Sequence, residues 1–172
     1  MNTIAKFGKV SYEQFKKDWL KLRPYYWDEG DIIKTIYDNI KLPKRATKGS
    51  AGYDFFTPVW LTIEPGVTAI IPTGIRCKID DGWVLQCYPR SGQGFKYRLQ
   101  LDNTVGIIDS DYYNSDNEGH IMLKITNDTR HNKVFEIDAG KGIMQGIFVP
   151  YGITVDDEVE AERNGGFGST EV

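Results

Sequence analysis

Between residue 55 and residue 149, apolar residues occur in short runs that turn signals separate, and this spacing constrains the fold more than any other feature of the chain. The runs span residues 60–63, 69–71, 83–88, 121–125, 134–137 and 147–149. The turn signals are Glu64-Pro65-Gly66, Asp80-Asp81-Gly82, Asn127-Asp128 and Ala139-Gly140. Short runs at this spacing predict the strands of an all-β barrel or sandwich.

The first forty residues follow a different pattern. Residues 3–10 can form a first strand, after which Ser11 and Gln14 make a capping-box pattern. Two apolar stripes at helical spacing follow, and they consist of Phe15, Trp19 and Leu22, and of Ile32, Ile33, Ile36, Tyr37 and Ile40. We expect residues 11–39 to form a helical insertion that packs on the body or on a neighbouring subunit.

Length and charge limit the remaining possibilities. A chain of 172 residues without a Pro/Ser-rich linker is expected to form a single domain, residues 1–172. A net charge of −3 argues against binding to a nucleic-acid backbone, but not to a single nucleotide held by a few cations. Cys77 and Cys87 lack metal or redox spacing and are expected to be core thiols. Without an apolar leader or membrane span, we expect a soluble, cytoplasmic protein.

Residues 103–112 combine a short apolar strand with groups suited to a ligand. Gly106 would let a ligand approach the backbone closely, and Asp109 would give that ligand a base. Aspartates at strand ends are more often turn residues than catalysts, so this segment alone does not decide between the two interpretations.

Similar glycine-rich polar segments recur between the apolar runs, at residues 49–54, 89–94, 142–146 and 163–170. In this order and combination, from about Ile40 to Thr170, they resemble the five motifs of the trimeric dUTPase family. The resemblance implies a jelly-roll-like β-barrel, a homotrimer whose sites are shared between subunits, and magnesium-dependent hydrolysis of dUTP to dUMP and pyrophosphate.

The segment after residue 89 suits a phosphate group. Arg90 supplies a permanent cation that can bind phosphate in a bidentate way, Ser91 supplies a hydroxyl, and Gly92 leaves backbone amides open for an anion-binding turn. An ordinary hairpin turn with a surface arginine is the alternative. The resemblance implies that these residues, with Gln145, bind the α and β phosphates.

The resemblance assigns residues 103–112 to the nucleoside. Asn103 and the backbone near Gly106 and Ile108 would pair with the uracil edge, and a close backbone would exclude the thymine methyl group. The ring of Tyr112 would stack beneath the deoxyribose and crowd a 2′-hydroxyl, whereas core packing is the more plausible role for Tyr113.

The same resemblance makes Asp109 the general base that activates water for attack on the α phosphorus. No direct metal ligand is expected from the protein, because magnesium would arrive with the triphosphate and keep most of its waters. Asp54 is expected to organise the phosphates and the magnesium without binding the ion directly.

Residues 163–172 are expected to form a flexible lid, although a disordered end is the default for a terminus. By resemblance, Phe167 would cover the uracil, Gly168 and Ser169 would wrap the γ phosphate, and Arg163 would add charge.

The chain departs from the family pattern at three places. Gly142 stands where a basic residue is usual, residues 114–118 form an acidic insertion, and Arg163 lies one place closer than usual to Gly165.

Two other functions are compatible with these motifs. A relative of dCTP deaminase would need a base at C4 of the pyrimidine, commonly a glutamate, and residues 103–112 contain no glutamate. A regulatory protein of dUTPase ancestry could use the N-terminal helices and the 114–118 insertion to bind a partner.

Overall fold

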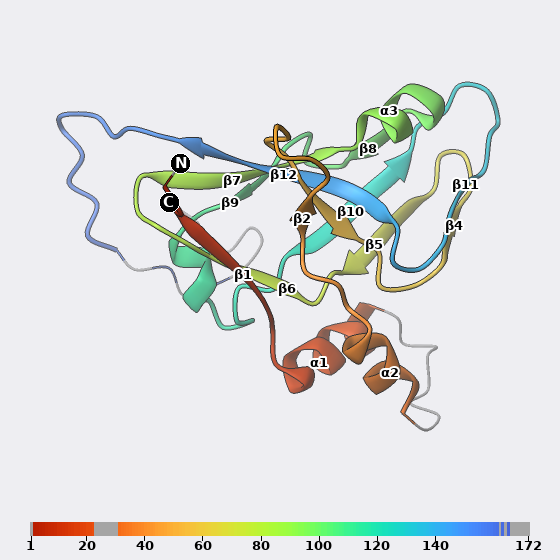
Figure 1. Ribbon diagram of the computed structural model, residues 1–172, viewed down its shortest axis with the longest axis horizontal. Coiled ribbons are helices and arrows are strands. Elements are labelled where there is room, and N and C mark those ends of the chain that lie inside the picture. Colours follow the sequence, from red (N-terminus) through yellow and green to blue (C-terminus); the bar gives the residue numbers. More distant parts are fainter. Residues whose placement is uncertain (1, 23–30, 162, 164, 166–172) are drawn as a thin grey trace.

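The computed structural model describes residues 2–22, 31–161, 163 and 165 (Figure 1). Its helices are α1 Tyr12–Leu22, α2 Ile32–Asp38, α3 Ser91–Tyr97 and the 3₁₀ helix η1 Asp111–Asn114. Its strands are β1 Ala5–Lys9, β2 Lys44–Arg45, β3 Tyr53–Phe56, β4 Leu61–Ile63, β5 Thr68–Pro72, β6 Ile75–Ile79, β7 Trp83–Pro89, β8 Leu99–Leu101, β9 Gly106–Ile108, β10 Met122–Asn127, β11 Phe135–Ile137 and β12 Gly142–Pro150.

The strands form sheets in which every described pair is antiparallel. The largest sheet has the order β2-β3-β12-β7-β9, and a second has the order β5-β10-β8. Two small sheets, β1-β6 and β11-β4, complete the body. The all-β fold predicted from the short runs and turn signals is confirmed, and so is the jelly-roll-like form that the family resemblance implies.

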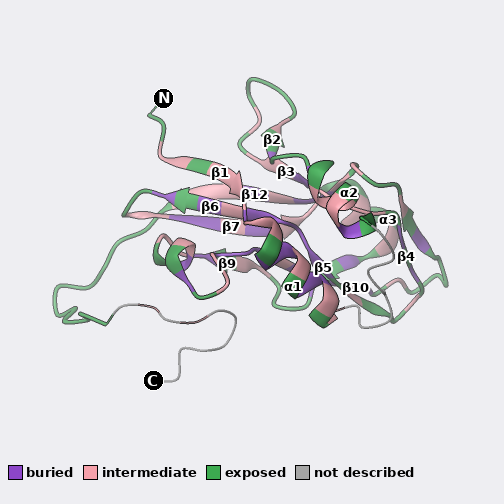
Figure 2. Cartoon of the chain, turned by 90° about the horizontal axis from the view of Figure 1, so that it is seen from below, coloured by how far each residue is buried: buried purple, intermediate pink, exposed green. Residues whose placement is uncertain are grey.

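The core lies between the sheets, where side chains of the largest sheet meet those of the three-stranded sheet (Figure 2). Phe55 and Leu85 come from the first of these sheets, and Ile71 and Leu123 come from the second. Each is at most 1% exposed, so both sheets turn large apolar side chains toward the same core.

Helices α1 and α2 lie together against the body at one side of the molecule (Figure 1). Phe15 and Trp19 of α1 are 0% exposed and belong to the same core cluster as the strand residues. Gly74, with φ +72°, makes room for this packing, because an added Cβ would lie 2.3 Å from Ile40 Cδ1 and 3.3 Å from the ring of Phe15. The insertion is therefore part of the core.

The start of α1 follows the sequence prediction only in part. Ser11 Oγ accepts a hydrogen bond from Gln14 N at 3.1 Å, as an N-cap residue should. In a capping box the Gln14 side chain would also accept a hydrogen bond from Ser11 N, but both described groups bond elsewhere. Ser11 N donates to Glu118 Oε2 at 2.7 Å, and Gln14 Nε2 donates to Asp18 Oδ2 at 2.8 Å. The backbone amide of Ser11, just before the helix, is thus bonded by a carboxylate from the body of the protein.

Two glycine-rich segments have more regular structure than their composition suggests. Residues 142–146 lie inside β12, where an added Cβ at Gly146 would stand 2.8 Å from Leu85 Cδ1 and 3.0 Å from the ring of Phe55. The expected turn after Pro89 is the start of α3. Both glycine clusters permit close packing or a change of direction, so glycine alone does not indicate a loop.

After β12 the chain runs along the outside of the molecule (Figure 2). Residues 151–161 are all exposed, and they include Ile153, Val155 and Val159, whose exposures are 75%, 107% and 81%. Among the described residues, no helix is long and apolar enough to cross a membrane.

Candidate active site

The first group of candidate residues surrounds Arg90, and we call it the Arg90 cluster: Asp54, Arg90, Gln93, Gly142 and Gln145. Its geometry follows from the register of three adjacent strands, since Gln145 of β12 lies opposite Asp54 on β3 and opposite Tyr88 on β7. Arg90 comes two positions after Tyr88, and in extended chain such positions share a face. The sheet therefore brings these side chains together.

Short contacts fix the guanidinium of Arg90 within this cluster. Arg90 Nε lies 3.0 Å from Asp54 Oδ1, and Arg90 Nη1 donates to Gly142 O at 3.2 Å. Gln93 Nε2 donates to the same carbonyl at 2.8 Å, and Gln145 Nε2 donates to Pro89 O at 3.2 Å. Asp54 and the Gly142 carbonyl thus orient a cation that remains 41% exposed to a ligand.

Two glycines, Gly142 and Gly52, leave room for the side chains of this cluster. A Cβ added to Gly142 would lie 2.9 Å from Arg90 Nη1, and one added to Gly52 would lie 2.8 Å from Gln145 Oε1. The space at Gly142, where the family pattern has a basic residue, is here filled by the guanidinium of Arg90. A side chain at position 142 would have to share this space with the guanidinium.

Ser91 and Gly92 occupy the first turn of α3 and are exposed. The expected anion-binding turn is thus a helix N-terminus, whose first amides have no acceptor within the helix. Gln93 was not predicted individually as a site residue. Residues three positions apart lie on the same face of a helix, so the spacing places Gln93 beside Arg90 only if this segment is known to be helical.

The second group, the nucleoside segment, comprises residues 103–120 and begins at the free edge of β7. Gly106, Ile107 and Ile108 pair there as β9. A Cβ at Gly106 would meet Cys87 Cβ at 3.1 Å, so the neighbouring strand itself requires this glycine. Burial raises the pKa of the Cys87 thiol to about 12, which makes it an unreactive core group, as expected.

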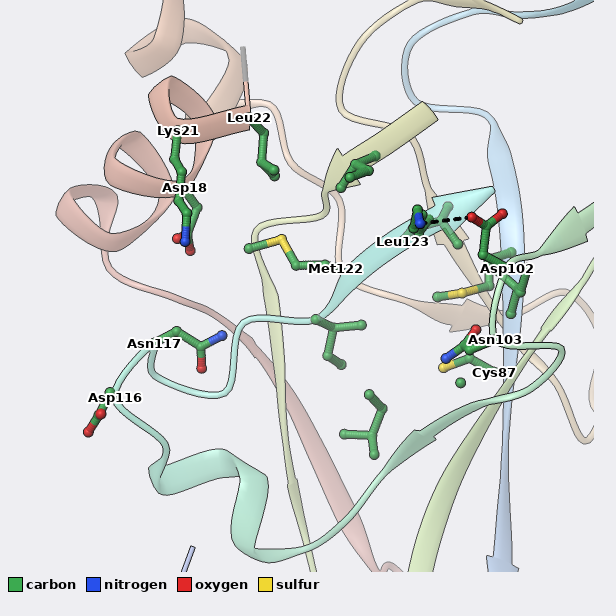
Figure 3. Close-up of a pocket in the computed structure, with 17 residues that line it drawn as sticks. Asp18, Lys21, Leu22, Cys87, Asp102, Asn103, Asp116, Asn117, Met122 and Leu123 are labelled. Carbon is green, nitrogen blue, oxygen red and sulfur yellow. Dashed lines mark ion pairs between the residues drawn. The ribbon is translucent and has the colours of Figure 1, made fainter. Parts of the chain in front are cut away.

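A cavity of about 740 Å³ opens beside this segment (Figure 3). Asn103, Gly106 and Ile108 line one part of it, and Asp18 and Lys21 of α1 line another. In Figure 3 the Asn103 side chain and the two α1 side chains lie on opposite sides, with Met122 between them. The structure thus places three predicted nucleoside residues on one cavity wall.

Asp109 lies just beyond β9 and pairs with the tail. Arg163 Nη2 lies 2.7 Å from Asp109 Oδ2, and Arg163 Nε lies 3.1 Å from Asp111 Oδ1. The Arg163 guanidinium is also 5.8 Å from the centroid of the Tyr112 ring. Arg163 therefore lies on the nucleoside segment of its own chain, over the residues expected to meet the sugar.

The two neighbouring tyrosines are buried in the opposite order from the prediction. Tyr112 is 4% exposed, belongs to the core cluster, and donates through its hydroxyl to His120 O at 2.8 Å. Tyr113 lies beneath the guanidinium of Arg76, with 3.6 Å between Arg76 Cζ and the ring centroid. The expectation that core packing suits Tyr113 better than Tyr112 was wrong, because η1 turns Tyr112 inward.

The two groups lie toward opposite ends of β7 in one chain (Figure 1). Ile108 pairs with Leu85, and Asp109 continues away from the end of β7 that carries Arg90. Arg90 lies five positions beyond Leu85, roughly 17 Å at the rise of a strand. One phosphate group cannot contact Asp109 and Arg90 of the same chain.

Other predicted residues do not gather into a metal centre. Among the residues that the structure describes, no group of three or more His, Cys, Asp and Glu side chains could hold a metal ion. Phe167, Gly168 and Ser169, assigned to the lid, lie outside the described residues, as does most of the segment 163–172.

The antiparallel, jelly-roll-like body defines the class of the protein, an all-β domain that carries an oriented arginine just beyond the end of β7. Comparison with known proteins narrows this class, since the family model described as dUTPase matches residues 38–171. Two relatives named deoxyuridine 5'-triphosphate nucleotidohydrolase are similar in sequence. The one from Lactococcus lactis is 43% identical and covers 82% of this chain and 96% of its own, and the one from Hahella chejuensis is 40% identical and covers 81% and 92%.

Solved structures agree with the family model. The crystal structure of dUTPase from Streptococcus mutans has a TM-score of 0.62 and 32% identity, and the match covers 88% of this chain and 98% of that chain. The dUTPase from phage phi11 of S. aureus, at 22% identity and a TM-score of 0.63 over 98% of this chain and 100% of its own, shows the same fold. The chain belongs to the dUTPase family.

Proposed function

We propose that the chain is a dUTP diphosphatase, which hydrolyses dUTP to dUMP and pyrophosphate. Family membership and the names of the relatives support this substrate. The observation that carries the proposal is the division of the polar residues into the Arg90 cluster, which suits phosphates, and the nucleoside segment, which suits a base and sugar. A nucleoside triphosphate has the same two parts.

The Arg90 cluster would bind the α and β phosphates. The Arg90 guanidinium is already oriented by Asp54, and charge-assisted hydrogen bonds from arginine to phosphate are among the stronger ones in proteins. Ser91 and Gly92 would add a hydroxyl and the free amides at the start of α3. Gln145 reaches the same place from β12.

The cavity beside β9 would hold the uracil. The Asn103 amide and the edge backbone of Gly106 and Ile108 can supply a pattern of donors and acceptors matched to uracil, which cytosine does not match. Tyr112 would lie beneath the deoxyribose and leave little space for a 2′-hydroxyl. Its hydroxyl group is held inside the protein, so only the ring would face the sugar.

Asp109 would be the general base that accepts a proton from the water attacking the α phosphorus. Its side chain is 44% exposed, so water can reach it. Arg163 bonds Asp109 and lies over the Tyr112 ring, so the tail must move before a sugar and water reach either residue. Positioning, charge neutralisation and one base suffice for this reaction, because it needs little covalent chemistry from the protein.

Magnesium would enter with the triphosphate. The described residues fit a hydrated ion better than a directly bound one, because Asp54 pairs with Arg90 and no three His, Cys, Asp or Glu side chains among them form a group that could hold a metal. Bound magnesium would neutralise charge on the phosphates, and Asp54 would face its water shell. A dUTPase from phage phi11 of S. aureus is described with a structural Mg(II) ion.

Complete sites would form in a homotrimer. The separation of Asp109 from Arg90 along β7 means that the two must come from different subunits to act on one substrate. The exposed apolar residues of 151–161 would be covered by a neighbour, and residues 163–172, with Phe167, Gly168 and Ser169, would then close over the neighbour's site as a lid.

One assay tests the proposed activity. The purified protein is incubated with dUTP, dCTP, dTTP and UTP, with and without magnesium, and the products are separated. We expect dUMP and pyrophosphate from dUTP in the presence of magnesium, and little from the other nucleotides. Release of a deaminated product from dCTP would indicate the deaminase group instead, and no reaction with any nucleotide would contradict the proposal.

A further inference from the structure

Two segments that lie outside the five motifs touch each other. Helix α1 lies before the residues that the family model matches, and residues 114–118 form the acidic insertion in the nucleoside segment. Glu118 accepts two hydrogen bonds from Ser11, one from the backbone N at 2.7 Å and one from Oγ at 2.6 Å. The acidic insertion is therefore attached to the first residue of the helical one.

A buried pair makes a second attachment next to it. His120 is 0% exposed, and its Nε2 accepts a hydrogen bond from Gly74 N at 2.8 Å. A nitrogen that accepts carries no proton, so the proton of the neutral ring lies on Nδ1, which donates to Asp18 Oδ2 at 2.6 Å. Gln14 donates to the same oxygen at 2.8 Å. Asp18 thus fixes both the position and the tautomer of His120.

This attachment leads directly to Tyr112. The Tyr112 hydroxyl donates to His120 O at 2.8 Å and accepts from Asn117 Nδ2 at 2.8 Å. Gly119, with φ +68°, closes the turn against this residue, since an added Cβ would lie 2.7 Å from Tyr112 O. The loop that α1 holds therefore encloses the hydroxyl end of the Tyr112 ring and sets its orientation.

Asp18 also lines the cavity that contains Asn103, Gly106 and Ile108 (Figure 3). Its carboxylate comes from a helix, whereas the facing residues come from the β9 hairpin. The support for Tyr112 and the wall of the expected uracil pocket are therefore parts of one structure.

We propose that Asp18 is a positioning residue for the nucleoside: through His120 it holds the Tyr112 ring where a deoxyribose fits and a ribose does not. The inference rests on the proposed function, and it assigns to the N-terminal insertion a part in sugar selectivity. Movement of His120 on loss of Asp18 releases the Tyr112 hydroxyl, and a ring free to shift admits a 2′-hydroxyl.

The test compares Asp18→Ala with the conservative Asp18→Asn, whose amide oxygen can still accept from His120 Nδ1. Asp38→Ala is the matched control, because Asp38 is an exposed carboxylate on α2 whose partner is Lys34, away from this network. KM and kcat for dUTP and for UTP are measured with magnesium, together with the melting temperature. The ring signal of Tyr112 is followed by NMR in protein with labelled tyrosine.

For Asp18→Ala we expect the ratio of kcat/KM for dUTP over UTP to fall roughly tenfold, the effect of one lost charged hydrogen bond, mainly through a lower KM for UTP. Asp18→Asn should recover most of the ratio, and Asp38→Ala should match the wild type. The Tyr112 signal should shift in Asp18→Ala alone. If Asp18→Ala does not fold, Glu118→Ala, which removes the neighbouring attachment, takes its place.

An unchanged ratio and an unchanged Tyr112 signal in a folded variant, even one with a lower melting temperature, would overturn the inference and leave Asp18 a purely structural role. Failure of the proposed function has a different signature, since the wild type itself would then not hydrolyse dUTP. The Tyr112 signal still decides in that case whether Asp18 positions the ring.

Discussion

The Arg90 cluster and the nucleoside segment differ in what holds them. Asp54, Arg90 and Gln145 lie on or directly after three neighbouring strands of one sheet, in register with one another. The nucleoside segment pairs with a single strand through β9, then leaves the sheet and is held by α1 and by Arg163. The register of one sheet builds most of the first region, whereas the second depends on contacts from outside that sheet.

The largest effect is expected at the nucleoside segment. Asp109→Asn keeps the shape of the side chain but removes the base, so turnover of dUTP should fall by about 10²–10⁴ while dUTP binding changes little. Steady-state rates and binding titrations on the same preparation measure the two effects separately. Turnover at the wild-type rate would remove Asp109 from the role of base.

The next effect tests the Arg90 cluster. In Gly142→Ala the new Cβ would lie 2.9 Å from Arg90 Nη1, so the guanidinium must leave Asp54 and the Gly142 carbonyl. We expect kcat/KM for dUTP to fall about 10- to 100-fold, as for loss of a charged hydrogen bond. Gly152→Ala is the control, since nothing lies within 4 Å of its added Cβ. Equal activities of the two variants would mean that the position of Arg90 does not matter.

The contrast between the two regions also explains which features could be predicted from the sequence. Strands with alternating burial, such as β10 and β4, follow from short apolar runs between turn signals, and the Arg90 cluster follows from motifs on adjacent strands. The inward turn of Tyr112 does not follow in this way, because it depends on bonds to Asn117 and His120 that no local pattern encodes.

Two further features required the structure. Whether the segment after Pro89 is a turn or a helix depends on short-range backbone bonds, such as Gly94 N to Arg90 O at 3.0 Å, in a sequence whose glycines favour neither strongly. The close approach at Gly142 could not be inferred either, because the sequence does not show that the guanidinium of Arg90, 52 positions earlier in the chain, packs against this glycine.

A smaller effect is expected on how stability depends on pH, because two carboxyl groups hold the nucleoside segment against the N-terminal segment. Burial acts to raise the pKa of Asp18 and of Glu118, but hydrogen bonds from His120 and Gln14 to the first, and from Ser11 to the second, outweigh it and lower both pKa values. Because folding lowers these pKa values, their contribution to stability is complete above about pH 5 and is lost as the pH falls further.

Thermal unfolding between pH 6 and pH 3 measures this contribution. The double variant Asp18→Asn, Glu118→Gln carries no charge at either position, so its melting temperature should fall less steeply with acid than that of the wild type. Parallel curves for the two proteins would show that these carboxyl groups do not couple α1 to the nucleoside segment.

The central claim is that the Arg90 cluster and the nucleoside segment of one chain serve different sites, and mixed oligomers test it most directly. Arg90→Ala and Asp109→Asn chains, each nearly inactive alone, are unfolded together in equal amounts and refolded, and mixed trimers are verified by mass spectrometry. If each site takes Arg90 from one subunit and Asp109 from a neighbour, random mixing should restore roughly a quarter of wild-type turnover. Verified mixed trimers no more active than the parent variants would contradict the account.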